Sequence, residues 1–279
     1  MDLEYLRALE ETRRTESLLP QEAICKERSF QHFTQQLEGR MEDDWDAVIG
    51  ICGEEGVGKT GLGIGTGMHI CKSNSYDTFL REHVVYSAQY QEFYDKFQAI
   101  QPGQTLQIDE AINIAYKRFW NNELQSKFNQ YLTKAREQRK CIFFCMPYFS
   151  DFDPYFRKHR IKFWIEVVSR GRAVVFVRDK VAGIEDPWHM KENEWLFRRH
   201  CGVKNIADRT LDDVLRGYRH YINYMFEFTF DDISDAVRKR YKELKKSVAE
   251  EYDKRANDQQ AIEHPRGRPG RPRKVDECI

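Results

Sequence analysis

The 279-residue sequence has no run of about eighteen apolar residues, so it predicts no membrane-spanning helix. Its first residues, MDLEYLRALEETRR, lack the apolar core and the cleavage site of a secretory signal peptide. No pair among its seven cysteines has the C-x-x-C spacing that is typical of zinc and redox sites. We therefore expect reduced, buried cysteines and a cytoplasmic protein.

The sequence also lacks an excess of charge of either sign. Lys and Arg number 45, Asp and Glu number 45, and the formal net charge is zero. This balance excludes a protein that binds polyanions through its overall charge, so any affinity for nucleic acid must come from local clusters. Apolar residues still make up 41% of the chain, which is enough for a substantial core.

Short apolar runs alternate with helical patterns through the middle of the chain. Strands are predicted at 47–52, 83–88, 105–109, 141–146, 163–168 and 173–177, and helices at 62–71, 89–100 and 122–139. Residues 169–172 read as a hairpin turn between the last two strands. The alternation predicts an α/β fold in which a mainly parallel sheet lies between helices.

A phosphate-binding motif follows the first predicted strand. Residues 53–60 read GEEGVGKT, the G-x-x-x-x-G-K-[ST] pattern of a P-loop. Glycines let backbone amides turn toward phosphates, Lys59 reaches the terminal phosphates, and Thr60 offers a hydroxyl to Mg²⁺. A glycine-rich turn without a ligand is the alternative, but it would need neither the strand before the loop nor the helix after it. The motif predicts ATP and Mg²⁺ as cofactors, and the expected nucleotide contacts are Gly53, Gly56, Val57, Gly58, Lys59, Thr60 and Gly61.

Two acids end the third predicted strand. We expect Asp109 to hold Mg²⁺ together with Thr60, and Glu110 to polarise the attacking water. The alternative is an acidic strand end that faces solvent. An acid directly after the metal-binding Asp favours hydrolysis over transfer of phosphate to a small molecule, and the absence of Asn-Lys-x-Asp argues against a GTPase.

These motifs and their neighbours resemble a known family. GEEGVGKT, IDEA at 108–111, KAREQRK at 134–140 leading into CIFFCMP, DFDPYFRKHR at 151–160 and a hairpin that begins RGR look like the zonula occludens toxin-like ATPases of the FtsK–HerA class. The resemblance covers roughly residues 47–180. It implies an oligomeric, ring-shaped ATPase that acts on double-stranded DNA, of viral, phage or plasmid type. Members commonly have a polar sensor where this chain has Met146-Pro147, so the resemblance leaves the sensor unidentified.

Motors of this class add an arginine from a neighbouring subunit to the active site. Arg136 and Arg139 are the first candidates for this catalytic role, and Arg157 and Arg160 are the second. A solvated charge on a helix is the alternative for each of them.

The C-terminal part of the chain is predicted to be helical and then disordered. Between residues 187 and 254, apolar residues recur at helical spacing, first from Leu211 to Met225 and again from Ile233 to Tyr252. The second stripe either packs on the protein's own P-loop domain or forms a subunit contact or short coiled coil. We thus expect four regions: a polar helical segment at 1–46, a P-loop ATPase domain at 47–186, a helical region at 187–254 and a disordered tail at 255–279.

The tail contains the core of an AT-hook. Gly and Pro keep PRGRPGRPRK thin and extended, so that its arginines can enter the narrow minor groove of A·T-rich DNA. The expected DNA contacts are Arg266, Gly267, Arg268, Pro269, Arg271 and Arg273. A solubilising basic tail and a localisation signal are the alternatives.

Together the motifs predict a homo-oligomeric ATPase that couples ATP hydrolysis to translocation or remodelling of DNA. An ATP-dependent DNA-binding switch without translocation, of a partitioning or regulatory kind, is the alternative, and a small-molecule kinase comes third.

Overall fold

The computed structural model describes residues 27–43, 46–86, 90–111, 122–181, 184–202 and 208–263. Within them, eight strands form one sheet in the order β1-β8-β7-β6-β2-β5-β4-β3. The strands are β1 (Glu27–Ser29), β2 (Ala47–Cys52), β3 (Val84–Val85), β4 (Thr105–Ile108), β5 (Cys141–Cys145), β6 (Phe163–Ser169), β7 (Arg172–Val177) and β8 (Tyr224–Thr229). The helices are α2 (Phe30–Glu42), α3 (Lys59–Ile70), α4 (Tyr76–Glu82), α5 (Tyr90–Ala99), α7 (Asn122–Glu137), the 3₁₀ turn η2 (Phe149–Asp151), α8 (Pro154–His159), α9 (Met190–His200), α10 (Leu211–Arg219) and α11 (Asp235–Glu263).

Most neighbouring strands are parallel, and β7 alone in this described sheet runs antiparallel to both of its neighbours. Strands β2, β4, β5, β6 and β8 therefore all end at the same side of the sheet, which we call the carboxyl edge. Their first residues lie at the opposite side, the amino edge. The two edges matter because ligands of open parallel sheets bind at the carboxyl ends of the strands.

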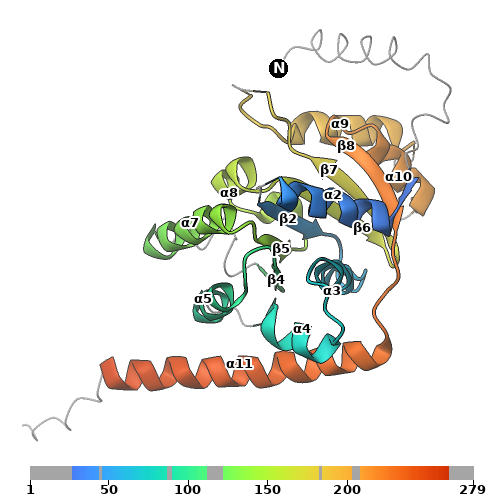
Figure 1. Cartoon of the computed structure of the whole chain (residues 1–279). Helices are drawn as coiled ribbons and strands as arrows, with labels where there is room; N and C mark the ends of the chain where they lie inside the picture. The colour runs from blue at the N-terminus through green and yellow to red at the C-terminus, as the bar shows by residue number, and fades with distance from the viewer. Residues whose placement is uncertain are drawn as a thin grey trace, which may run out of the picture.

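Helices cover both faces of this sheet (Figure 1). Successive residues of β2 point to opposite faces: Val48 and Cys52 join the core under α5, α7, α8 and α10, whereas Ile49 and Ile51 join the core under α2 and α3. Every residue of β2 is buried, as expected for a strand covered on both sides. The predicted α/β architecture, with a mainly parallel sheet between helices, is confirmed.

Two strands were not predicted: β1, in a segment that was expected to be helical, and β8. The sequence led us to expect only helices after residue 187, but Tyr224–Thr229 forms β8, which pairs with β1 and β7. Helical spacing continues from Leu211 as far as Met225, although α10 ends at Arg219. The strand has its own signal, because Phe226, Phe228 and Phe230 alternate with other residues and are buried on the α2 side of the sheet.

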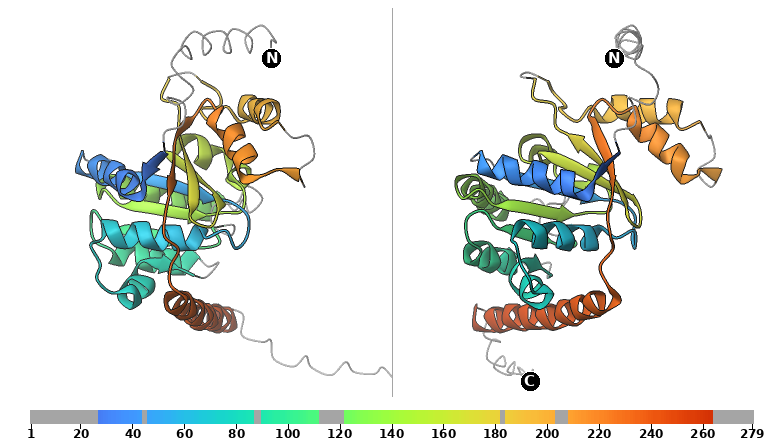
Figure 2. Two further views of the ribbon diagram at one scale, coloured as in Figure 1. Left: turned by 90° about the vertical axis from the view of Figure 1, so that its right-hand side faces the viewer. Right: turned by 45° about the vertical axis from the view of Figure 1, so that its right-hand side comes forward.

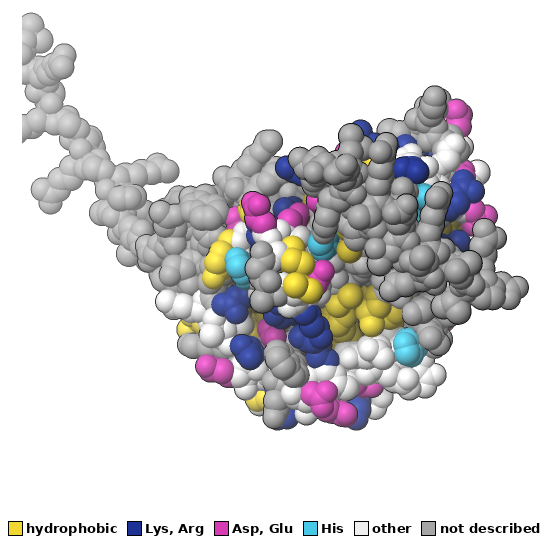
Figure 3. Space-filling view, turned by 90° about the horizontal axis from the view of Figure 1, so that it is seen from above, with side chains coloured by type: hydrophobic (Ala, Val, Ile, Leu, Met, Phe, Trp, Pro, Cys, Tyr) yellow, Lys and Arg dark blue, Asp and Glu magenta, His cyan; other side chains and the backbone are white. Residues whose placement is uncertain are grey.

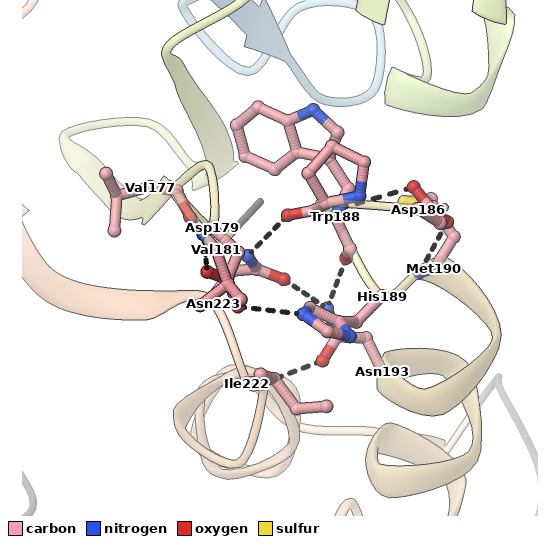
Figure 4. A network of polar contacts seen from close by, with 11 residues as sticks. Val177, Asp179, Val181, Asp186, Trp188, His189, Met190, Asn193, Ile222 and Asn223 are labelled. Carbon is pink, nitrogen blue, oxygen red and sulfur yellow. Dashed lines mark hydrogen bonds and ion pairs between the residues drawn. The ribbon is translucent and has the colours of Figure 1, made fainter. Parts of the chain in front are cut away.

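Buried polar contacts attach the segment after residue 187 to the sheet (Figure 4). The Asn193 amide on α9 donates to Trp188 O at 2.9 Å and to the Asn223 side chain at 3.0 Å, and accepts from Ile222 N at 2.7 Å. Asn223 in turn donates to Val177 O at 2.9 Å. A buried amide must keep its partners, so this network fixes α9 against the end of β7 and the start of β8.

The long helix α11 crosses one side of the molecule next to α4 (Figures 1 and 2). Its apolar stripe, including Tyr241, Leu244 and Val248, packs with Ile64 of α3 and Phe79 of α4. Of the two alternatives for this stripe, the structure therefore shows packing on the protein's own α/β domain.

Helix α11 also continues to Glu263, so the expectation of disorder from residue 255 was wrong for residues 255–263. Extending an existing helix costs far less than starting one, and a polar sequence with Ala and Gln can continue a helix that packing has already begun. Residues 1–26 and the predicted AT-hook residues 266–273 lie outside the described part of the chain. No helix among the described residues is long and apolar enough to cross a membrane.

Candidate nucleotide site

The predicted phosphate loop and the predicted acids meet at the carboxyl edge of the sheet. Strand β2 ends where the loop begins, and β4 ends at Asp109 and Glu110. Strand β5 lies between them and pairs with both. Two strand spacings amount to about 10 Å, so side chains from the loop and from the acids must reach toward each other across the end of β5.

The loop has a backbone that requires glycine. Gly53, Gly56 and Gly58 have φ angles of 139°, 78° and 105°, a region that favours residues without a Cβ. A Cβ at Gly53 would also lie 2.5 Å from Val167 O. Gly58 caps α3 without a side-chain hydrogen bond, so no side chain of the cap satisfies the amides of the first turn. Such amides, at the positive end of a helix, are suited to bind a phosphate.

The side chain of Lys59 contacts the loop, and that of Thr60 contacts Asp109. The Lys59 ammonium donates to Gly53 O and Glu54 O, each at 2.7 Å, and so lies over the loop. Thr60 Oγ1 donates to Asp109 Oδ1 at 2.8 Å. The contact brings together a hydroxyl and a carboxylate, which are hard oxygen ligands of the kind that Mg²⁺ prefers.

No group of three His, Cys, Asp or Glu side chains among the described residues could hold a metal by itself. A Mg²⁺ ion bound to Thr60 and Asp109 would therefore take its remaining ligands from water and from phosphate oxygens, as is usual for this ion. The residues present thus fit a Mg²⁺–nucleotide complex.

Two side chains of α11, which sequence reasoning missed, cover the acids. Tyr241 donates its hydroxyl to Asp109 Oδ2, and Lys245 Nζ lies 3.1 Å from Asp109 Oδ2 and 2.5 Å from Glu110 Oε1. Burial, followed by the charge of Asp109, raises the pKa of Tyr241 above its usual range, so the phenol stays protonated and donates. Burial lowers the pKa of Lys245, but the two carboxylates outweigh it and the pKa is raised.

Glu110 differs from Asp109 in its exposure. Its side chain is 66% exposed and that of Asp109 is 6% exposed, so Glu110 can contact water while Asp109 is enclosed. Glu110 also has a φ of 51°, a conformation that non-glycine residues rarely adopt. Local strain of this kind is common where a side chain is aimed at a reaction centre.

The turn between β6 and β7 also reaches the phosphate loop. Arg170 Nε donates to Gly56 O at 3.0 Å. The sequence identified residues 169–172 as a hairpin turn, but nothing local showed that the turn lies beside the loop, because that depends on β6 pairing with β2. Together, Lys59, Arg170 and Lys245 place three cations of one chain at the carboxyl edge.

Glu166 was also not predicted from the sequence as part of the site. It lies on β6 opposite Cys52, the last residue of β2. Burial raises the pKa of its carboxyl group to about 7, although the hydrogen bond from Trp164 and the charge of Lys59 oppose the shift. Trp164 Nε1 donates to Glu166 Oε2 at 2.9 Å. Near neutral pH, this carboxyl group beside the loop therefore exists in both its protonated and its ionised form.

The four candidate arginines do not join this site within one chain. Arg136 and Arg139 lie just before β5 and therefore at the amino edge, about 16 Å from the carboxyl edge for a five-residue strand. Arg157 lies on α8 with its guanidinium near the Phe149 ring, and Arg160 donates to Thr133 Oγ1 at 2.7 Å.

A cavity of about 460 Å³ flanks the first turns of α3. Gly61 and Gly65 form one side, and rings of Phe30, Tyr76 and Phe230 are among the others. A Cβ on Gly65 would meet no atom within 4 Å, so the helix presents open space here. Phe230 also lies 3.9 Å from the Cβ position of Gly58, which places the cavity next to the loop.

In comparisons with known proteins, no protein-family model matches the chain, and no curated protein has a significantly similar sequence.

Proposed function

We propose that the protein binds and hydrolyses Mg²⁺–ATP at the carboxyl edge and couples this reaction to translocation or remodelling of double-stranded DNA. The observation that carries the ATPase part is the 2.8 Å contact between Thr60 and Asp109, made beside Lys59 and the uncapped start of α3. The DNA part is supported by the AT-hook core in the tail and by the resemblance to DNA-pumping ATPases.

Each residue of the site has a role in this proposal. Bound Mg²⁺ would supply positive charge that neutralises the phosphates. Lys59 exchanges its loop carbonyls for phosphate oxygens, and Thr60 and Asp109 hold the ion. Glu110 is exposed at the end of β4, where it orients a water molecule and accepts its proton. The cavity beside α3 is lined in part by the flat rings of Phe30, Tyr76 and Phe230, which suit the base of the nucleotide.

The homo-oligomer is part of the same proposal. Because Arg136 and Arg139 lie at the amino edge of their own chain, they can reach an active site only in a neighbouring copy. Lys245 and Arg170 already bring positive charge to the carboxyl edge of the same chain. A neighbour's arginine would therefore add to these cations rather than replace them.

The proposal is tested by measuring ATP turnover with and without duplex DNA. We expect duplex DNA to stimulate turnover several-fold, and the protein to displace a tightly bound protein from duplex DNA only when ATP is hydrolysed. Stimulation without displacement would favour the switch. Absence of stimulation, with phosphate transferred to a small molecule, would favour a kinase.

The switch remains the second candidate, because α11 offers a mechanism for it. The nucleotide-binding acids contact Tyr241 and Lys245, and the AT-hook residues follow the end of α11 in sequence. If Mg²⁺–ATP displaces Lys245 from the acids, the position of α11 and of the DNA-binding tail depends on the nucleotide.

Replacing Lys245 tests this competition. Lys245→Ala is expected to tighten Mg²⁺–ATP binding about fivefold, because the ion no longer has to displace an ammonium group worth about 1 kcal/mol from the carboxylates. Isothermal titration calorimetry measures the change, and Lys246→Ala, at the exposed neighbouring position, is the matched control. Weaker binding in Lys245→Ala alone would show that Lys245 holds the nucleotide and does not compete with it.

A further inference from the structure

A second concave site lies at the amino edge of the sheet, on the opposite side from the phosphate loop. A cavity of about 680 Å³ opens between α2, the beginning of β6 and the end of β7. We call it the amino-edge pocket. Phe163 and Met225 give it an apolar part, and its other walls are polar.

Cations from three elements converge on this pocket. Arg40 comes from α2, Lys162 directly precedes β6, and Arg178 and Lys180 follow β7. Asp43 is the acid in the same lining. Figure 3 shows a face of the molecule on which Lys and Arg side chains gather beside hydrophobic ones.

The fold holds two of these cations through neutral carbonyl groups. Arg40 Nε donates to Asp46 O at 3.0 Å, and Arg178 donates to Lys158 O at 2.9 Å and to His159 O at 3.1 Å. A carbonyl orients a guanidinium but leaves its full positive charge in place. Lys162 Nζ has no hydrogen-bond partner within the described part of the chain.

Burial and the neighbouring positive charges both disfavour the charged form of Lys162. Burial, followed by the charge of Arg178, lowers the pKa of Lys162 to about 8, and Arg40 and Arg136 contribute in the same direction against Asp46. Burial also lowers the pKa values of Arg40 and Arg178. A bound anion would relieve this repulsion, which Asp43 in the lining and Asp46 near Lys162 oppose only in part.

Positive charge also continues beyond the pocket along the amino edge. Lys158 lies in the last turn of α8, Arg136 in the last turn of α7, and Arg139 between α7 and β5. An anion with a single phosphate would use only part of this surface. A chain of phosphates can contact the pocket and part of the neighbouring surface together.

We propose that the amino-edge pocket binds the phosphate backbone of a nucleic acid, with Lys162, Arg178, Arg40 and Lys180 as the contacts. The site gives the folded domain a nucleic-acid contact of its own, separate from the tail. Because it lies at the opposite edge from the phosphate loop, nucleic acid and nucleotide can bind at the same time. The inference extends the proposed function but does not require ATP hydrolysis.

The test uses the full chain and a 30-base-pair duplex of mixed sequence, with binding measured by fluorescence anisotropy over a range of KCl concentrations. For Lys162→Ala/Lys180→Ala we expect about tenfold weaker binding, and a slope of log K against log salt that is smaller in magnitude by about 1.8, since each lost phosphate contact contributes about 0.9. Lys239→Ala/Lys242→Ala, at exposed positions on α11, should leave both quantities unchanged.

Two further measurements keep the test decisive. Lys180→Glu changes an exposed side chain, so it should weaken duplex binding without lowering the melting temperature. ATP affinity should be unchanged in all these variants, whether or not the protein hydrolyses ATP. Unchanged duplex affinity and salt slope would overturn the proposal. Loss of ATP affinity with intact duplex binding would also overturn it, because the pocket would then bind the phosphates of a nucleotide.

Discussion

Lys59→Ala is expected to raise the Kd for ATP at least about a hundredfold. Its ammonium now has two neutral carbonyl partners at 2.7 Å, which phosphate oxygens can replace with charged ones. Hydrogen bonds between charged groups contribute about 1.5–3 kcal/mol each, so losing two of them, about 3–6 kcal/mol, corresponds to more than about a hundredfold change. Isothermal titration calorimetry with ATP and Mg²⁺ provides the measurement.

A control must show that the loss of affinity comes from removing a lysine at position 59 and not from removing any one positive charge. Lys242→Ala removes the same charge from an exposed site on α11 and is expected to leave the Kd within a factor of two. The melting temperature of each variant shows whether the loop has lost its structure together with its lysine. Binding by Lys59→Ala within twofold of the wild type would contradict a phosphate site at residues 53–60.

Glu110→Gln should lower the rate of hydrolysis about 10²- to 10⁴-fold while ATP still binds, because a positioned general base contributes this much to a rate. Glutamine has nearly the same shape and can still accept a hydrogen bond from Lys245, but it cannot accept a proton. The side chain is exposed, so the lost ion pair should change the free energy of unfolding by no more than about 1 kcal/mol.

The measurement is kcat at saturating ATP, together with the Kd for ATP. Glu54→Gln is the matched control, since Glu54 is an exposed acid of the loop itself. Normal turnover by Glu110→Gln would leave this residue as a strand-end acid without a catalytic role.

Mixing Glu110→Gln with Arg136→Ala should restore some activity if the arginine of one copy acts at the active site that contains the intact glutamate of another copy. Absence of rescue would contradict such a shared active site.

Much of the site could be predicted because its signals are local. Glycine at 53, 56 and 58 is required by backbone angles that belong to the loop itself, and a helix follows the loop as predicted, although it begins at Lys59 and not at residue 62. The apolar run of β5 is long enough to be a strand and too short for a typical helix, so its identity did not depend on distant residues. Asp109 could be placed beside Thr60 because strands of a parallel sheet end at the same edge.

Contacts that depend on how separate elements pack could not be predicted. Lys245 is 135 residues from Glu110 in sequence, and the apolar stripe next to it has the same spacing whether α11 packs on α4 or on another chain. Arg170 looked like an ordinary turn residue until β6 was placed beside β2.

The sequence by itself thus determined the glycine-rich turn between β2 and α3, the position of the acids at the end of β4 and the α/β class, because glycine conformation and apolar periodicity act over a few neighbouring residues. Only the tertiary structure decided that β8 joins the sheet, that α11 covers Asp109 with Tyr241 and Lys245, and that basic residues meet at the amino edge. The physical reason is that burial and charge depend on distance in space, which strand order and helix packing set between residues far apart in the chain.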